Sequence, residues 1–125
     1  MSEDPEKFYE MQMLEEQIKA TQQMLDNAAE QLSTVKSTIQ ALEEFEGLQG
    51  KEECLFPLAN GILAPGKLQG KKLLVNVGAG VVKEKTIPQT IKSLKEQEEE
   101  VNQFMQKIEA QHAELAKQVE KYRDQ

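Results

Sequence analysis

Few residues of this 125-residue chain have the chemistry of a catalytic site, and they are isolated from one another. His112 is the single histidine, and its His-Ala-Glu context matches the first part of a zinc-deaminase motif, but no Pro-Cys-x-x-Cys follows. Cys54 is the single cysteine, and no histidine or aspartate lies near it in the sequence to activate a thiolate. Gly78-Ala79-Gly80 lacks the third glycine of a dinucleotide-binding loop. We therefore expect no enzymatic activity, no metal and no cofactor.

The composition narrows the classes of partner and compartment. Fifteen basic residues face 22 acidic ones, which gives a net charge of −7, so nucleic acid is not expected as a partner. One cysteine cannot form an internal disulfide, which is typical of a reducing compartment. No apolar run approaches the roughly 18 residues of a membrane span, and no apolar signal-peptide core follows the acidic first residues. We expect a cytoplasmic protein that does not enter a membrane.

A long helix is predicted over residues 5–46. Asp4 is a suitable N-cap and Pro5 suits the first helical position, while Gly47 and Gly50 end the helix. Apolar positions alternate at spacings of three and four residues without a break, which is the period of about 3.5 residues that indicates a coiled coil. These seam positions are Met11, Leu14, Ile18, Thr21, Leu25, Ala28, Leu32, Val35, Ile39 and Leu42.

A second helix of similar length is predicted over residues 87–122. Thr86 and Gln89 have the spacing of a capping box, in which each residue satisfies a backbone N–H of the other. The same alternation of three and four residues follows, with two polar members. These seam positions are Ile91, Leu94, Glu98, Val101, Met105, Ile108, His112, Leu115, Val119 and Tyr122.

The two predicted helices should pair as an antiparallel coiled-coil hairpin. A register that places Leu42 opposite Ile91 also places Thr21, the polar member of the first seam, opposite His112. A register chosen for helix length alone need not match polar positions in this way. We therefore interpret Thr21 and His112 as a polar layer that sets the register, in preference to a role for His112 as a catalytic base or metal ligand.

The segment between the helices predicts two β-hairpins. Asn60-Gly61 separates apolar runs at 54–58 and 62–68, and Asn-Gly is the strongest short hairpin signal because both turn residues adopt positive φ. Gly78-Ala79-Gly80 separates 72–77 from 81–86 in the same way. Isolated hairpins are marginally stable and leave unpaired edges. Because the two helices already cover each other, partner chains must cover the hairpins, so we expect an obligate oligomer.

This layout and the hairpin sequences resemble the alpha class of prefoldin subunits. The segments that carry the resemblance are Leu-Phe-Pro-Leu-Ala-Asn-Gly at 55–61, Pro-Gly-Lys-Leu at 65–68 and Leu-Leu-Val-Asn-Val-Gly-Ala-Gly-Val-Val-Lys-Glu-Lys-Thr at 73–86. The resemblance implies one prefoldin-like domain over residues 1–125, mainly α with a small β part. It also implies a hexamer of two alpha-class and four beta-class subunits, whose hairpins form a β-barrel body that carries six coiled coils.

The resemblance further implies a molecular chaperone that holds non-native proteins at its coiled-coil tips and passes them to the group II chaperonin without ATP. Four apolar residues near the start of the first helix are the expected client-binding residues, although they could instead cap the end of the seam: Phe8, Tyr9, Met11 and Met13. The expected oligomer interface in the hairpins is Leu55, Phe56, Leu58, Ile62, Leu73, Val75, Val77, Val81 and Val82.

A second function fits the same predicted fold. A coiled-coil scaffold that assembles through its β-hairpins and only holds its partners apart would share the helices and the oligomer. It would not need apolar side chains exposed at the helix ends. Whether the purified hexamer holds an unfolded chain separates the two hypotheses.

Overall fold

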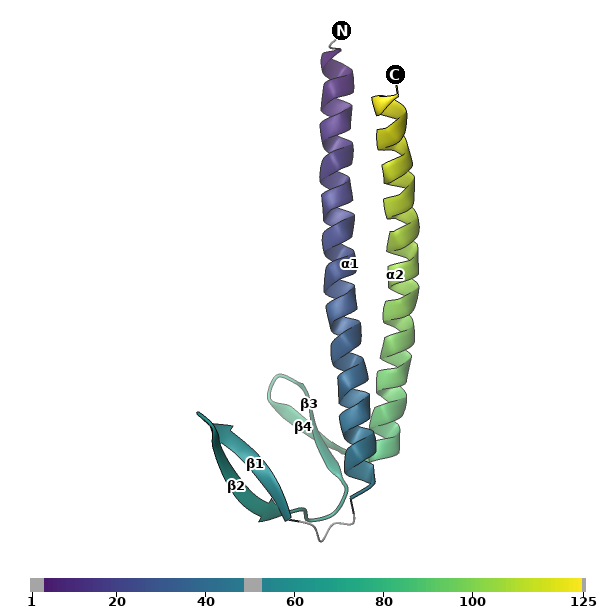
Figure 1. The fold of residues 1–125 in the computed structure, drawn as a ribbon. Helices are drawn as coiled ribbons and strands as arrows, with labels where there is room; N and C mark the ends of the chain where they lie inside the picture. The colour runs from purple at the N-terminus through teal and green to yellow at the C-terminus, as the bar shows by residue number, and fades with distance from the viewer. Residues whose placement is uncertain (1–3, 49–52, 125) are drawn as a thin grey trace. The chain divides into compact units, whose positions relative to one another are not determined.

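The computed structural model describes residues 4–48 and 53–124. Its elements in chain order, shown in Figure 1, are α1 (Pro5–Glu46), β1 (Glu53–Ala59), β2 (Ile62–Lys67), β3 (Leu73–Gly78), β4 (Val81–Lys85) and α2 (Ile87–Arg123). The predicted fold class, two long helices with two β-hairpins between them, is confirmed. Gly50, named above as an end of the first helix, lies outside the described residues. No described helix has both the length and the apolar character that crossing a membrane requires.

The N-terminus of α1 is capped as the sequence predicts. The Asp4 carboxylate accepts a hydrogen bond from the Glu6 backbone N–H at 3.0 Å, and the Asp4 carbonyl accepts one from the Phe8 N–H at 3.0 Å. The first bond satisfies a backbone N–H that has no partner within the helix, and the second is the first regular hydrogen bond of the helix. At the other end, the Gly47 N–H bonds to the carbonyl of Glu43 at 3.3 Å, which closes the last turn.

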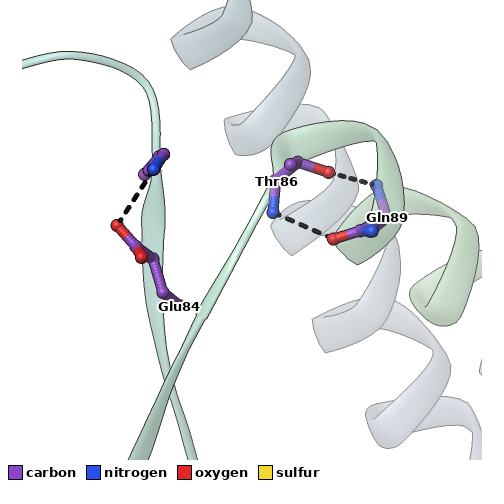
Figure 2. Close-up of polar contacts among 4 residues, drawn as sticks. Glu84, Thr86 and Gln89 are labelled. Carbon is purple, nitrogen blue, oxygen red and sulfur yellow. Dashed lines mark hydrogen bonds and ion pairs between the residues drawn. The ribbon is translucent and has the colours of Figure 1, made fainter.

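The capping box at the start of α2 is also present. The Gln89 N–H donates to the Thr86 hydroxyl at 3.2 Å, and the Thr86 N–H donates to the Gln89 side-chain oxygen at 3.2 Å. Figure 2 shows the two bonds as a reciprocal pair at the junction of β4 and α2. The first turn of α2 thus begins immediately after the last hairpin, so the end of the strand and the start of the helix are set by the same two residues.

Replacing Thr86 with alanine should destabilise the protein by about 1 kcal/mol, because the helix loses its N-cap. For a chain of this size the loss lowers the Tm by roughly 4 °C. Thermal unfolding followed by the helical circular-dichroism signal measures the change. Ser93→Ala, at an exposed position inside α2, is the control and should leave the Tm nearly unchanged. Equal Tm values for the Thr86→Ala variant and the parent would show that the cap is not a stabilising contact.

The chain divides into two compact units. One unit contains α1 up to Thr34 and α2 from Gln97. Within it, Thr21 of α1 is hydrogen-bonded to His112 of α2, and Glu10 of α1 to Tyr122 of α2. Glu10 precedes Thr21 in α1, whereas its partner Tyr122 follows His112 in α2, so the two helices run antiparallel. Its buried and half-buried helix positions are those of the predicted seam: Met11, Leu14, Ile18, Thr21, Leu25, Ala28, Leu32, Glu98, Val101, Met105, Ile108, His112, Leu115, Val119 and Tyr122, with Asn102 beside them.

The other unit, Val35–Glu96, contains the two hairpins and the adjoining ends of both helices. Its buried side chains are Val35, Ile39 and Ile87. Ile87, the first residue of α2, is only 2% exposed, although it precedes the predicted seam. A hydrogen bond of 2.8 Å from the Lys71 ammonium to the Glu46 carbonyl joins the segment between the hairpins to the end of α1 within this unit. Lysine at a helix C-terminus is favourable because it satisfies a free carbonyl.

The hairpins form two separate two-stranded antiparallel sheets, β1–β2 and β3–β4. Asn60 and Gly61 have φ values of 51° and 77°, as the Asn-Gly turn requires. The second turn places Ala79 and Gly80 at φ values of 52° and 75°. Gly66 lies so close to the Phe56 ring that an added Cβ would stand 2.8 Å from its Cε2 atom. Any larger residue at position 66 would therefore require the Phe56 ring to move.

Candidate binding surfaces

The first candidate surface is the tip, defined as Phe8, Tyr9, Met11 and Met13 in the first turns of α1. Phe8 is 65% exposed, Tyr9 is 64% exposed and Met13 is also exposed. Met11 is half-buried, as its seam position predicts. The structure therefore divides the predicted tip residues into one that supports the seam and three that face solvent. Three exposed apolar side chains within six residues form a small adhesive surface, and the flexible methionine can adapt to partners of different shape.

A contact that sequence reasoning missed lies beside the tip. The Tyr122 hydroxyl of α2 donates a hydrogen bond to the Glu10 carboxylate of α1, which joins the two helices near the start of α1. The pKa of Tyr122 is raised above its ordinary value, first by this hydrogen bond and then by desolvation and the nearby negative charge. The phenol therefore keeps its proton, and so the bond, to higher pH. A register that places Met11 opposite Tyr122 was the signal that could have located this contact.

A polar groove of about 460 Å³ adjoins the Glu10–Tyr122 bond. Three carboxylates and two lysines are among the residues that line it, so it offers no single sign of charge. The residues that line it are Asp4, Glu6, Lys7, Glu10, Gln118, Lys121 and Tyr122. Its mixed charges suit a solvated helix end more than a specific small-molecule site. The apolar tip residues are therefore the stronger candidate for binding.

The predicted polar layer is formed by a direct contact. Thr21 Oγ1 lies 2.8 Å from His112 Nδ1, and the Thr21 hydroxyl also donates to the Ile18 carbonyl at 2.9 Å. A hydroxyl has one proton to donate. Because that proton goes to Ile18, the oxygen accepts from His112, whose Nδ1 therefore carries a proton. Thr21 is buried and His112 half-buried, so this bond satisfies polar atoms that would otherwise be costly within the seam.

Replacing both Thr21 and His112 with leucine should stabilise the helical pair by roughly 1 kcal/mol, because a satisfied polar layer is often less stabilising than a packed apolar one. Thr21→Leu alone should destabilise it by about 1 kcal/mol, since His112 then keeps a half-buried N–H without its acceptor. Thermal unfolding of the two variants at equal concentration tests both values. A lower Tm for the double variant would show that the layer is a net stabilising contact.

The second candidate surface is the β-region, defined as β1 to β4 and the turns within each hairpin. Leu58 is 66% exposed, and most of the other predicted interface residues are exposed as well: Leu55, Phe56, Ile62, Val77, Val81 and Val82. Leu73 and Val75 are half-buried. Sequence reasoning missed Leu63 and Leu74, of which Leu74 is 76% exposed. Both hairpins therefore present more apolar side chains to solvent than the alternating pattern predicts.

The residues first considered for catalysis are not assembled into a site. Cys54 is half-buried in β1, and His112 is hydrogen-bonded to Thr21. Among residues 4–48 and 53–124, no three histidine, cysteine or acidic side chains gather as metal ligands would. The two surfaces that remain, the tip and the β-region, are both suited to binding polypeptides.

Comparison with known proteins places this chain in a family. The model of the family described as "Prefoldin subunit" matches residues 14–125. The chain belongs to the prefoldin family. Two relatives named prefoldin subunit alpha support this. The protein from Archaeoglobus fulgidus is 29% identical, and the match covers 82% of this chain and 76% of that protein. The protein from Pyrococcus horikoshii is 30% identical, and the match covers 89% of this chain and 76% of that protein.

The fold agrees with a solved prefoldin-like structure. A filamentous PFD from Methanocaldococcus jannaschii superposes with a TM-score of 0.75 at 18% sequence identity, covering 89% of this chain and 93% of that one. At this identity the likeness concerns the fold. The arrangement of two long helices around two β-hairpins is therefore that of a prefoldin subunit, and the resemblance drawn from the hairpin sequences is confirmed.

Proposed function

We propose that this chain is an alpha-class subunit of a cytoplasmic prefoldin that acts as a holdase: its tip binds non-native proteins and prevents their aggregation. The observation that carries this proposal is the exposure of Phe8, Tyr9 and Met13 on a helix whose seam is already formed. Membership of the prefoldin family supports it. A scaffold with the same fold would gain nothing from these exposed side chains, which carry a risk of aggregation.

Client capture at the tip is weak for one chain and strong for an assembly. A non-native protein exposes apolar segments, and burying one side chain of this size against them contributes at most about 1.5–3 kcal/mol. Several tips that face one client bind it together, because each bound tip raises the effective concentration of the others. Release then requires competition by a stronger binder and no nucleotide. The group II chaperonin is the receiver that this proposal assigns.

The assembly that brings the tips together is proposed to be a hexamer of two such chains and four beta-class subunits. The exposed apolar side chains of the β-region support it, since two-stranded sheets are marginally stable unless another surface covers them. Exposed edges of this kind are also templates for pairing with further strands. The β-region is therefore assigned to assembly and the tip to client capture, so the two activities lie on different parts of the chain.

The function is tested with the purified complex of this chain and a beta-class prefoldin subunit. Aggregation of a chemically unfolded client protein is followed by light scattering in buffer without nucleotide. We expect the complex to suppress scattering at near-equimolar concentration and to release the client for refolding when a group II chaperonin is added. A complex of the correct mass that leaves scattering unchanged would favour the scaffold function instead.

A further inference from the structure

The two faces of the β3–β4 hairpin differ in charge. Leu73 is the register partner of Lys85 and Val75 that of Lys83, so all four side chains lie on one face. Leu73, Val75 and Lys85 are half-buried and Lys83 is exposed. This face, which we name the lysine face, therefore combines an apolar strip on β3 with two positive charges on β4. No carboxylate stands opposite either lysine in the register.

Two lysines in or next to the β-region, unlike those of the lysine face, lie near a carboxylate. Glu84, on the opposite face of the same hairpin, forms an ion pair of 3.7 Å with Lys72, and the interaction is drawn in Figure 2. Glu53 of β1 stands directly opposite Lys67 of β2. Both glutamates of the described hairpins are thus matched with lysines that do not belong to the lysine face.

The lysine face is left with a surplus of charge. The Lys71 side chain donates to the Glu46 carbonyl, whereas the Lys83 and Lys85 side chains form no hydrogen bond or ion pair with any residue that the structure describes. Residues 47–86 hold six lysines and three glutamates, a net charge of +3, although the whole chain carries −7. The net positive charge of the protein is therefore confined to the segment between the helices, residues 47–86, which includes the apolar side chains of the β-region.

We propose that the lysine face docks on an apolar, acidic surface of a different chain. This inference rests on the proposed function, in which the β-region mediates assembly, and it specifies the chemistry of the partner. A second copy of this chain brings the same surplus of lysines in its own β-region, so like charges oppose an isologous contact. The acidic helices of a second copy use their apolar seam for each other, and the apolar side chains that they expose at the tip are assigned to clients by the proposed function. The matching surface therefore belongs to a chain whose hairpin carries carboxylates beside apolar residues.

A complex with an acidic partner chain and self-association of this chain should respond to salt in opposite ways. Salt screens attraction and repulsion alike, so raising it from about 0.05 M to about 0.5 M should weaken a complex between opposite charges and strengthen self-association of like charges. A beta-class prefoldin subunit is the probe for the first, and this chain alone is the sample for the second. We expect the hetero-complex to weaken roughly two- to thirtyfold, the range of two exposed ion pairs.

Charge reversal locates the effect on the lysine face. Lys83→Glu/Lys85→Glu should weaken the hetero-complex at low salt and remove most of its salt dependence. Lys107→Glu/Lys117→Glu, on exposed positions of α2, changes the net charge equally and should have little effect. The neutral Lys83→Gln/Lys85→Gln variant, which perturbs folding least, should give about half of the change. Analytical ultracentrifugation measures affinity, and circular dichroism confirms that each variant is folded.

The possible results separate this inference from the function on which it rests. A hetero-complex that forms but ignores salt, or that responds equally to both charge-reversal variants, overturns the lysine-face assignment and leaves the proposed assembly standing. A chain that forms no complex with the beta-class subunit at any salt concentration overturns both. Weakening by salt together with selective loss in the Lys83→Glu/Lys85→Glu variant supports both.

Discussion

A variant with serine at Phe8, Tyr9 and Met13 is expected to assemble normally and to protect clients less well. The three side chains are exposed, so their removal leaves the seam intact. Each contact with a client that is lost costs about 1.5–3 kcal/mol, and the loss of one such contact of about 2 kcal/mol weakens binding at that tip roughly thirtyfold. Because beta-class tips still act, the complex as a whole should lose only part of its protection, measured as light scattering from an aggregating client.

The matched control for this variant replaces three exposed polar residues further along α1. Glu16→Ser, Gln17→Ser and Lys19→Ser remove the same number of side chains and introduce the same residue. This control should protect clients as well as the parent protein does. Equal protection by parent, tip variant and control at equal hexamer concentration would show that the tip residues of this subunit do not bind clients.

The largest effect on assembly is expected from Leu58→Ser/Leu74→Ser. Both leucines are exposed on the hairpins, so the variant chain should fold as the parent does. If partner chains bury them, their removal costs about 3–6 kcal/mol per chain, or roughly two to four orders of magnitude in affinity. Native mass spectrometry with a beta-class subunit should then show free subunits where the parent forms a hexamer.

Two observations would contradict this account of assembly. Gln69→Ser/Gln106→Ser is the control, because both glutamines are exposed and polar, and it should assemble fully. If the leucine variant assembles as well as this control, the hairpins are not the interface. A parent chain that remains a stable, folded monomer at micromolar concentration would equally contradict an assembly that depends on covering the β-region.

Much of the fold could be predicted because its signals are local and repetitive. The seam of the helical pair repeats at one period over both helices, so each exposed or buried position follows from its neighbours. The capping box at Thr86 and Gln89 and the Asn60-Gly61 turn depend on a few residues that satisfy their own backbone. Such signals are independent of what surrounds the segment.

The surfaces were predicted less completely because they depend on contacts between distant segments. Leu74 is one residue out of step with Leu73 and Val75, so it lies on the face that also carries Asn76 and Glu84, where strand alternation gives no reason to expect an exposed apolar side chain. Ile87 lies four residues before Ile91 and so continues the spacing of the seam, but the predicted seam began at Ile91 and left this buried residue out. The Glu10–Tyr122 bond joins residues 112 positions apart, which no local pattern reveals.

Client binding at the tip is tested most directly by site-specific photo-crosslinking. A photoreactive phenylalanine analogue is placed at Tyr9, and in a second protein at Lys107, an exposed position in the middle of α2. Each is assembled with beta-class subunits and irradiated with an unfolded client. We predict crosslinks to the client from position 9 and few from position 107. Crosslinks that are equal at both positions, or stronger from position 107, would contradict client capture at the tip.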